Sequence, residues 1–260
     1  MIRALDQLDA TPLIGIGDNP QSPFVSPNGQ WVGYFDAAGF LKKVPINGGP
    51  AVPLCRLDQG PPRSGAWGED GAVVFATDGG LDGLLRVSDS GGEPTALTNP
   101  DRVAGEVDHI LPSFLPGGHA LLFTISTAGG IDNNEIAVLD LRTGKYRVLI
   151  HGGSDAHYVP SGHLVYAAGG TLRAIAFDLD RLEVMGAAAT VVQPVSTTPA
   201  GAADFDVART ARLSTLMEMP AWSSATGCSG SIARAASSQS MPNTATTSTH
   251  VCRPTGPASR

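Results

Sequence analysis

The chain has 260 residues, 42% of them hydrophobic, so it is long and apolar enough to bury a sizeable core. Its net charge of −7 argues against nucleic acid or an anionic membrane as a partner, and its three cysteines lack the spacing of a disulfide framework or zinc site. We find neither an apolar run of about 18 residues nor the basic and apolar regions of a signal peptide. We therefore expect a soluble chain that itself makes no membrane contact.

One short pattern occurs four times along the chain. Each copy has a tight turn that ends in glycine, followed by runs of residues that favour β-strands. The four turns are Ser26-Pro27-Asn28-Gly29, Gly68-Glu69-Asp70-Gly71, Leu115-Pro116-Gly117-Gly118 and Val159-Pro160-Ser161-Gly162. Their last glycines are 42, 47 and 44 residues apart, and a period of about 40–50 residues made only of strands is typical of a propeller blade.

Each copy contains four predicted strands, in which β-branched and aromatic residues stand between Gly, Pro, Asn and Asp clusters. The first copy has strands at 22–25, 31–35, 40–46 and 51–55, and the second at 65–67, 72–76, 84–87 and 95–97. The third has strands at 113–115, 120–124, 135–141 and 146–150, and the fourth at 156–159, 164–167, 172–177 and 190–192. Glycines at 48–49, 91–92 and 144 can supply the positive φ that tight hairpins between the third and fourth strands require.

Two fragments flank the four complete copies. Residues 3–13 resemble the last two strands of a preceding blade, and residues 203–207 resemble the first strand of a following one. The predicted fold is therefore all-β: a partial β-propeller of about four complete four-stranded antiparallel blades plus two fragments, within residues 1–207. Because an unclosed ring exposes blade faces and strand edges, we expect the isolated chain to be poorly soluble or partly molten.

Residues 208–260 differ in composition from the rest of the chain. Up to Ala208 there are 12 Lys+Arg and 23 Asp+Glu, whereas from Arg209 there are five basic residues and a single acidic one, Glu218. Ser and Thr are frequent there and the strand pattern stops, which predicts a disordered tail. A reading-frame error just after Ala208 is the second interpretation, since shifted codons can encode the Asp-Gly turn and the β-run that the repeat requires.

Five stretches of the chain resemble the TolB-like, WD-repeat-like six-bladed β-propeller family. Residues 26–35, Ser-Pro-Asn-Gly-Gln-Trp-Val-Gly-Tyr-Phe, are similar to its Ser-Pro-Asp-Gly signature, and 40–49, 64–71 and 136–144 continue the likeness. Residues 3–13 are the most specific stretch, and together the five resemble the propeller C-terminal to bacterial transmembrane Ser/Thr protein kinases. The chain departs from the family at Asn28, Gly117 and Ser161, where Asp is usual, although these residues also suit turns.

The resemblance implies a sensing or interaction domain that lies outside the cytoplasm in a longer parent protein. Kinase motifs are missing from this sequence, so we expect no enzyme activity of the chain itself. The predicted function is a non-catalytic binding module of a bacterial membrane signalling protein. It would bind an unknown protein or small ligand at the mouth of the propeller channel, where the innermost strands converge. The alternatives are the propeller of a prolyl-oligopeptidase-like hydrolase and a truncated product without independent function.

No residue is predicted to be catalytic, to bind a cofactor or to bind a metal. Five histidines (His109, His119, His151, His157 and His163) match no metal motif and are interpreted as exposed or turn residues. The run Asp132-Asn133-Asn134-Glu135 lacks the spacing of a calcium loop, which favours a polar connection between strands. The run His151-Gly152-Gly153-Ser154-Asp155 has the residue types of a hydrolase site, but neighbours in one loop cannot form that geometry.

The remaining candidates are interpreted as structural. Gly15-Ile16-Gly17 lacks the third glycine and the strand–helix context of a nucleotide loop. Four aromatic residues, Trp31, Trp67, Phe114 and Tyr158, could line a channel, but repeated aromatics more often form the core between blades. Cys55 ends an apolar strand, which predicts a small buried hydrophobic residue.

Overall fold

The computed structural model describes residues 12–17, 19–58, 60–78 and 83–207, together with the backbone of 212–216 and 236–240. These residues form four four-stranded antiparallel sheets and one three-stranded sheet, and every sheet follows the order of the chain. A single 3₁₀ turn, η1 (Ile131–Asn133), is the only helical element in the described residues. Among the same residues, no helix has the length and apolarity needed to cross a membrane.

The four sheets correspond to the four predicted blades. The first blade contains β1 (Gln21–Val25), β2 (Trp31–Phe35), β3 (Phe40–Pro45) and β4 (Val52–Arg56). The second contains β5 (Pro62–Trp67), β6 (Ala72–Thr77), β7 (Leu85–Ser88) and β8 (Thr95–Ala96). The third contains β9 (Glu106–Phe114), β10 (Ala120–Thr127), β11 (Glu135–Asp140) and β12 (Lys145–His151). The fourth contains β13 (Ser154–Val159), β14 (His163–Ala168), β15 (Thr171–Asp178) and β16 (Glu183–Val192).

The repeated glycines have the conformation that the turns demand. Gly29, Gly71, Gly118 and Gly162 have φ values of 68°, 77°, 67° and 78°, in the left-handed region where a side chain is strained. Each closes the turn between the first and second strand of its blade. The all-β partial propeller predicted from the sequence is therefore confirmed.

Two strands begin seven residues earlier than the sequence pattern predicted. β9 begins at Glu106 rather than at residue 113, and β16 begins at Glu183 rather than at residue 190. The first half of β9 is polar, and β16 contains Gly186 and three alanines, so both segments have weak intrinsic strand preference. Pairing with β10 and with β15 keeps them extended.

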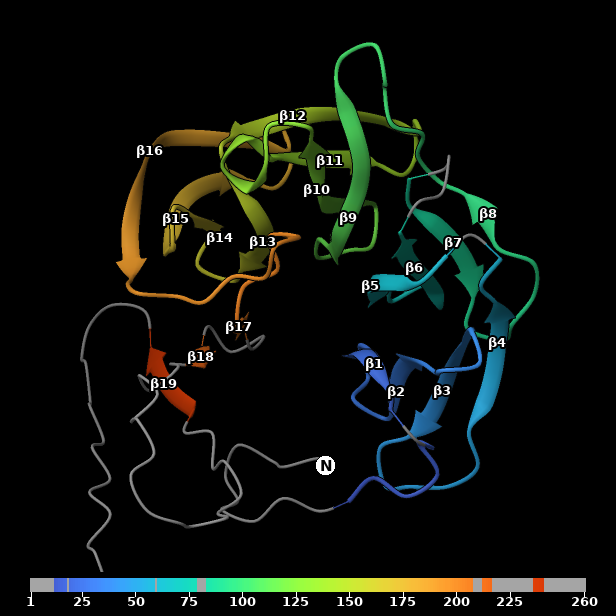
Figure 1. Cartoon of the computed structure of the whole chain (residues 1–260). Coiled ribbons are helices and arrows are strands. Elements are labelled where there is room, and N and C mark those ends of the chain that lie inside the picture. Colours follow the sequence, from blue (N-terminus) through green and yellow to red (C-terminus); the bar gives the residue numbers. More distant parts are fainter. Residues whose placement is uncertain are drawn as a thin grey trace, which may run out of the picture.

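The blades lie in chain order around a common centre (Figure 1). The first strand of each blade, β1, β5, β9 and β13, lies innermost, and the fourth strand lies at the periphery. The innermost strands of consecutive blades are in contact with one another. Residues from all four blades therefore border this centre.

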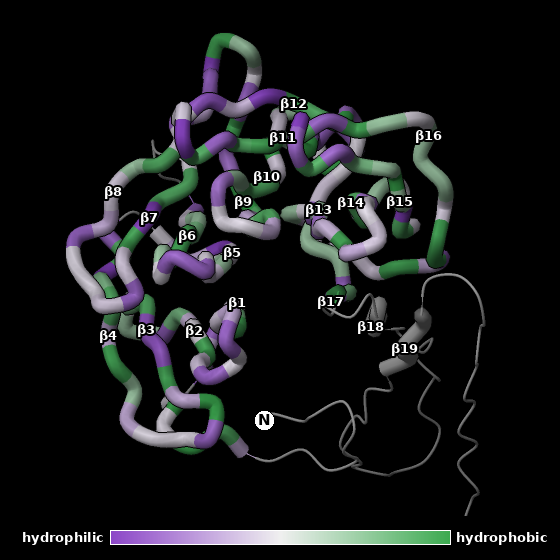
Figure 2. The backbone as a smooth tube through the Cα atoms, turned by 180° about the vertical axis from the view of Figure 1, so that it is seen from behind, coloured by the Kyte–Doolittle hydropathy of each residue, from purple (hydrophilic) through white to green (hydrophobic). Residues whose placement is uncertain are grey.

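The hydrophobic core lies between successive blades. Phe35 and Leu41 of the first blade pack with Val73 and Phe75 of the second. Equivalent clusters join the second blade to the third, the third to the fourth, and the fourth to Phe205 and neighbouring residues. Figure 2 shows the same pattern, since β6 is hydrophobic whereas β5, the innermost strand of the same blade, is hydrophilic. Burial thus depends on the repeat, because one blade forms the core of its neighbour.

The other face of the first blade is covered by residues that precede it. Leu13 is buried against Val32, Tyr34 and Val44, and Ile16 packs on the same cluster. The predicted strand fragment at residues 3–13 falls outside the described residues except for Pro12 and Leu13, which are not in a strand.

A fifth sheet begins where the sequence predicted a fifth blade. β17 (Phe205–Val207) pairs with β18 (Arg212–Leu216), which pairs with β19 (Ala236–Ser240). The other residues of the segment 208–260 lie outside the described part of the chain. The domain boundary, the disordered tail and the shifted reading frame therefore stay predictions.

Candidate functional site

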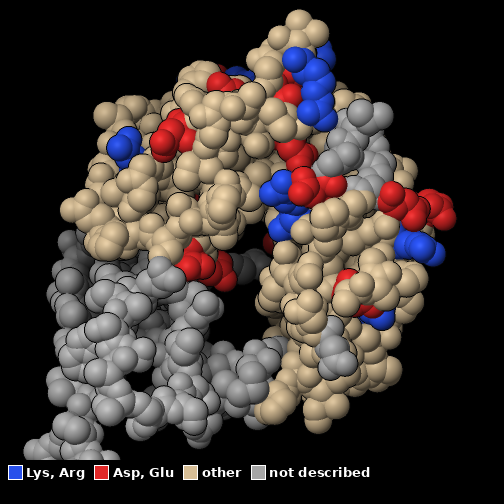
Figure 3. Space-filling view, viewed as in Figure 1, with Lys and Arg blue, Asp and Glu red and all other residues tan. Residues whose placement is uncertain are grey.

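A groove of about 890 Å³ lies where the innermost strands end. The strands β1, β5, β9, β13 and β17 and the turns that follow them supply most of its lining. The residues that the argument uses are Phe24, Val25, Trp67, Glu69, Ser113, Phe114, Asp155, His157, Tyr158, Phe205 and Asp206. The space-filling surface is hollowed at the centre of the ring, and carboxylate side chains border the hollow (Figure 3).

The innermost strands share an irregularity next to the groove. Ser22, Leu111 and Asp155 have φ values of 45°, 55° and 54°. Ser22 and Leu111 lie three residues before the last residue of β1 and of β9, and Asp155 lies four residues before the last residue of β13. The register of all four innermost strands shifts at this level. Left-handed backbone at a residue other than glycine is strained, so surrounding contacts must hold it in place.

Hydrogen bonds between blades hold these bulges. Ser22 Oγ donates to the carbonyl of Arg63 at 3.0 Å, joining the first blade to the second. The amide of Leu111 donates to Ser64 Oγ at 2.9 Å, joining the third blade to the second. The amide of Asp155 donates to Thr124 Oγ1 at 2.9 Å, joining the fourth blade to the third.

Asp155 also orients a histidine inside the groove. His157 Nε2 lies 3.2 Å from Asp155 Oδ1, and the amide of Ala203 donates to Asp155 Oδ2 at 2.8 Å. The other ring nitrogen, His157 Nδ1, lies 3.4 Å from Ser113 Oγ, and the ring packs edge-to-face against Phe205 at 5.1 Å. The imidazole thus contacts three consecutive blades.

The charges around His157 favour its protonated form. Burial alone would lower the pKa of His157, but the hydrogen bond to Asp155 and the charges of Asp155 and Asp206 outweigh burial and raise it. The imidazole of His157 is therefore protonated more readily in this site than an imidazole in water at the same pH.

Three of the four predicted aromatic residues fulfil both of the roles considered for them. Trp67 is buried in the core between the first two blades and also lines the groove, as do the half-buried Phe114 and Tyr158. Trp31 packs on the same core without lining the groove, and Lys43 Nζ lies over its ring. The favoured interpretation, core between blades, was thus incomplete for three of the four.

The interpretation of the histidines as exposed or turn residues was wrong for His157, which is half-buried in β13, and for His109. The side chain of His109 is fully buried, with Nδ1 2.8 Å from Thr98 Oγ1 and Nε2 3.0 Å from Glu106 Oε2. Burial outweighs the carboxylate and lowers the pKa of His109. His119 and His151 are exposed, and His163 contacts Ser161 of its turn. No group of three or more metal-ligating side chains occurs in the described ranges.

The two polar runs do not form the sites that their residue types suggest. Asp132 to Asn134 belong to η1 and the connection from β10 to β11, where the carbonyl of Asn134 accepts the amides of Gly152 and Gly153. In the second run, buried Ser154 donates to the carbonyl of Gly201 at 2.7 Å. Exposed His151 contacts Glu135 instead of Ser154.

Cys55 and the N-terminal glycines are structural. Cys55 is buried as predicted, and burial together with Asp58 and Glu93 raises its pKa to about 11. Gly15 packs against the carbonyl of Gly49, whose amide donates to the carbonyl of Ile14.

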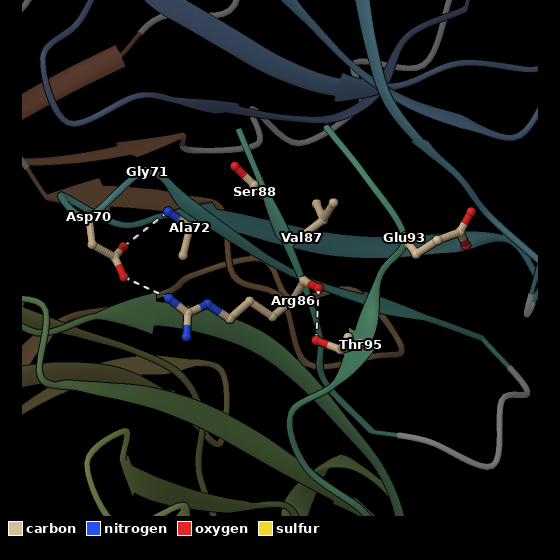
Figure 4. Close-up of a pocket in the computed structure, with 8 residues that line it drawn as sticks. All are labelled: Asp70, Gly71, Ala72, Arg86, Val87, Ser88, Glu93 and Thr95. Carbon is tan, nitrogen blue, oxygen red and sulfur yellow. Dashed lines mark hydrogen bonds and ion pairs between the residues drawn. The ribbon is translucent and has the colours of Figure 1, made fainter. Parts of the chain in front are cut away.

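A second depression, of about 350 Å³, lies on the surface of the second blade (Figure 4). Arg86 Nη2 pairs with Asp70 Oδ2 at 2.8 Å, and Asp70 Oδ1 accepts the amide of Ala72. Thr95 Oγ1 contacts the carbonyl of Arg86 at 3.4 Å. The polar groups of this depression are already paired with one another at an exposed surface. The groove at the ends of the innermost strands is therefore the better candidate site.

Sequence reasoning missed the contribution of Asp155, Phe24 and Asp206 to the groove. Phe24 and His157 occupy equivalent places in β1 and β13, two residues before the first turn residue, and Asp155 precedes His157 by two residues. Aligning the repeats residue by residue would have identified these positions. The contact between Asp155 and the fifth sheet has no local sequence signal, because it joins residues 48 apart.

No family model matches the chain, and no curated protein matches it. Many solved structures resemble it, and three of them serve as examples. Regucalcin, a calcium-binding protein from Agrobacterium tumefaciens str. C58, superposes with a TM-score of 0.57 at 15% identity, over 80% of this chain and 69% of that one. An auxiliary nutrient binding protein from Bacteroides thetaiotaomicron VPI-5482 superposes with a TM-score of 0.52 at 12% identity, over 81% of this chain and 50% of that one. TolB from Acinetobacter baumannii superposes with a TM-score of 0.51 at 18% identity, over 77% of this chain and 47% of that one.

These similarities show the fold. They confirm the β-propeller fold that the sequence predicted. The chain spans about half the length of the nutrient binding protein and of TolB. At such low identity, the activities of the three proteins are not carried over to this chain.

Proposed function

We propose that this β-propeller is a non-catalytic binding module, and that the groove at the end of its channel binds a protein or a small ligand. The observation that carries the proposal is the groove itself, whose volume of about 890 Å³ falls within the usual range for ligand sites. Aromatic side chains from all four blades line it, and they provide contact area together with polar edges.

The bulges support the same conclusion. Strained backbone at Ser22, Leu111 and Asp155 lies beside the groove, where hydrogen bonds between blades hold it. Strain of this kind gathers at binding sites, because it fixes side chains before a ligand arrives. The groove is therefore preformed, which lowers the entropy cost of binding.

The larger protein context is part of the proposal. On the sequence resemblance, the module belongs to a bacterial membrane signalling protein with a Ser/Thr kinase domain, and it lies outside the cytoplasm. The neighbouring DNA tests this. An upstream kinase domain followed by a transmembrane helix supports it, whereas a downstream Gly-x-Ser-x-Gly hydrolase contradicts it.

A matched pair of variants tests the binding site. Val25 is 56% exposed and lines the groove, whereas Val52 is 40% exposed and lies on β4 of the same blade, outside the groove. We expect Val25→Trp to weaken binding of the neutral probe N-phenyl-1-naphthylamine at least fivefold, with Val52→Trp close to the unaltered chain. Equal binding by both variants, with unchanged circular dichroism, would show that the groove is not the site.

One observation favours a second candidate function, ester hydrolysis. Ser113, His157 and Asp155 form a continuous line of hydrogen-bonding groups, although the serine contacts Nδ1 and the carboxylate Nε2. A hydroxyl, an imidazole and a carboxylate in this order can act as nucleophile, base and orienting group. The serine–imidazole distance of 3.4 Å is longer than a strong hydrogen bond, so binding remains the better supported function.

The hydrolase candidate has a direct test. Full-length chain is incubated with p-nitrophenyl acetate and butyrate, and release of p-nitrophenol is compared with that by Ser113→Ala. Turnover that disappears in Ser113→Ala supports hydrolysis. Rates equal to those of Ser113→Ala eliminate it.

A further inference from the structure

The lining of the groove is acidic and aromatic. It contains the carboxylates of Glu69, Asp155 and Asp206, and none of the described lining residues is Lys or Arg. Arg63 lies at the other end of β5 from Trp67, and its guanidinium pairs with Asp78 at 2.6 Å. No Lys or Arg side chain of the described lining therefore offsets these carboxylates, and the described groove has a negative potential.

Asp206 is a carboxylate of the lining that is available to a ligand. It is exposed, and its Oδ1 accepts the amide of the adjacent Val207 at 2.7 Å. A carboxylate accepts several hydrogen bonds, so this contact leaves capacity for a cationic donor. Asp155 is by contrast buried, and it already accepts from Ala203 and contacts His157.

The groove already stabilises one positive charge. The pKa of His157 is raised although burial acts in the opposite direction, and Asp155 and Asp206 are the causes. A guanidinium or ammonium group at the same carboxylates gains the same attraction. Unlike His157, it keeps its charge at neutral pH.

The aromatic residues suit the remainder of such a ligand. Trp67 and Phe114 lie at the ends of neighbouring innermost strands, and the rings of Phe24 and Trp67 are 6.3 Å apart. Aromatic faces attract cations and also bury apolar side chains. Because the groove crosses the ends of five strands, an extended segment can reach the carboxylate and the aromatic rings together.

We propose that the occupant of this groove is an extended segment of a partner protein, which places a Lys or Arg side chain at Asp206 and apolar side chains at Trp67 and Phe114. This inference rests on the proposed binding function. It adds the chemical class of the partner, namely a basic segment flanked by apolar residues.

Three peptides that differ at one position test it. Each is acetylated, amidated and fluorescein-labelled, with the sequence Gly-Leu-X-Phe-Leu-Gly and Arg, Gln or Glu at X. By fluorescence anisotropy with the full-length chain, we expect the Arg peptide to bind at least tenfold more tightly than the Gln peptide, and the Glu peptide to bind most weakly. Raising the salt from about 0.05 M to 0.5 M should weaken only the Arg peptide.

Two carboxylate variants locate the effect. Asp206→Asn should reduce the Arg-to-Gln preference to threefold or less while leaving the Gln peptide unchanged. Asp132→Asn, at an exposed carboxylate on η1 outside the groove, should leave all three affinities unchanged. If Asp206→Asn does not fold, the peptide series and its salt dependence decide alone.

The outcomes separate this inference from the proposed function. If the three peptides bind equally and Val25→Trp weakens all of them, the groove is a binding site but does not select a cation, and the inference fails alone. The same holds if N-phenyl-1-naphthylamine binds in the groove and none of the peptides does. If Val25→Trp changes neither probe nor peptide binding, the proposed function fails as well.

Discussion

Asp155 Oδ1 lies 3.2 Å from His157 Nε2, although the two residues belong to one strand and are only two positions apart. The bulge at Asp155, with φ 54°, turns its carboxylate toward the imidazole and toward the amide of Ala203 in the next sheet. One backbone irregularity thus places a carboxylate beside the imidazole in the groove.

This pair predicts a pH-dependent contribution to stability. The pKa of His157 is higher in the folded chain than the value of about 6.5 in an unfolded one. A raised pKa stabilises the fold in full below the unfolded value, and the contribution is lost as pH rises through the folded value. We therefore expect the stability difference between the unaltered chain and His157→Gln to be largest near pH 5.5 and to shrink toward pH 8.5.

Urea unfolding at several pH values measures this difference. Buried His109 has a lowered pKa, so its effect on stability has the opposite sign, and it cancels when the two chains are compared at each pH. Because both chains keep His109, only the His157 contribution remains. A difference that is constant from pH 5.5 to 8.5 contradicts the prediction.

Much of the fold could be predicted because it depends on short stretches of sequence. The turn glycines at 29, 71, 118 and 162 require positive φ, and β2 and β6 are short runs of strand-forming residues that fill the core. The early starts of β9 and β16 could not be predicted, since pairing rather than composition extends them.

The site could be predicted only in part. The aromatic residues at 67, 114 and 158 share a place in the repeat, so the sequence raised a channel lining as one of two interpretations. The burial of His109 depends on Thr98 and Glu106, and the position of Asp155 depends on Thr124 and Ala203. These contacts join different strands or blades, and a single sequence does not show which residues meet there.

Thr124 should be important for the junction between the third and fourth blades. It is fully buried, and its Oγ1 accepts the amide of Asp155 at 2.9 Å. Thr124→Val keeps the shape but leaves that amide without its acceptor, which costs about 1–3 kcal/mol of unfolding free energy. Urea unfolding measures the loss, and Thr143→Val at an exposed turn is the control. A loss equal to that of the control would show that the bulge bond contributes little.

Phe24 lies between glycines of two blades. A Cβ at Gly33 would lie 2.4 Å from Phe24 Cε2, and one at Gly65 would lie 2.5 Å from Phe24 Cε1. Gly65→Ala should therefore displace the ring and destabilise the chain by about 1–3 kcal/mol. Because Leu is smaller and flexible, Phe24→Leu should relieve the clash. In a double-mutant cycle by urea unfolding we expect the double variant to lose less stability than the sum of the single variants, and additive losses would contradict this.

β16 should be the part of the described structure most prone to pair with other chains. It is the edge strand of its sheet, it has ten residues, and neither a charge nor a proline occurs from Val184 to Val192. An uncharged edge presents free backbone groups to a second strand, and a lysine there blocks pairing. Ala187→Lys should therefore slow aggregation at 37 °C, followed by light scattering, whereas Ala104→Lys adds the same charge at an exposed turn and should not. If the two variants aggregate at equal rates, net charge rather than the β16 edge governs association, and the edge assignment is wrong.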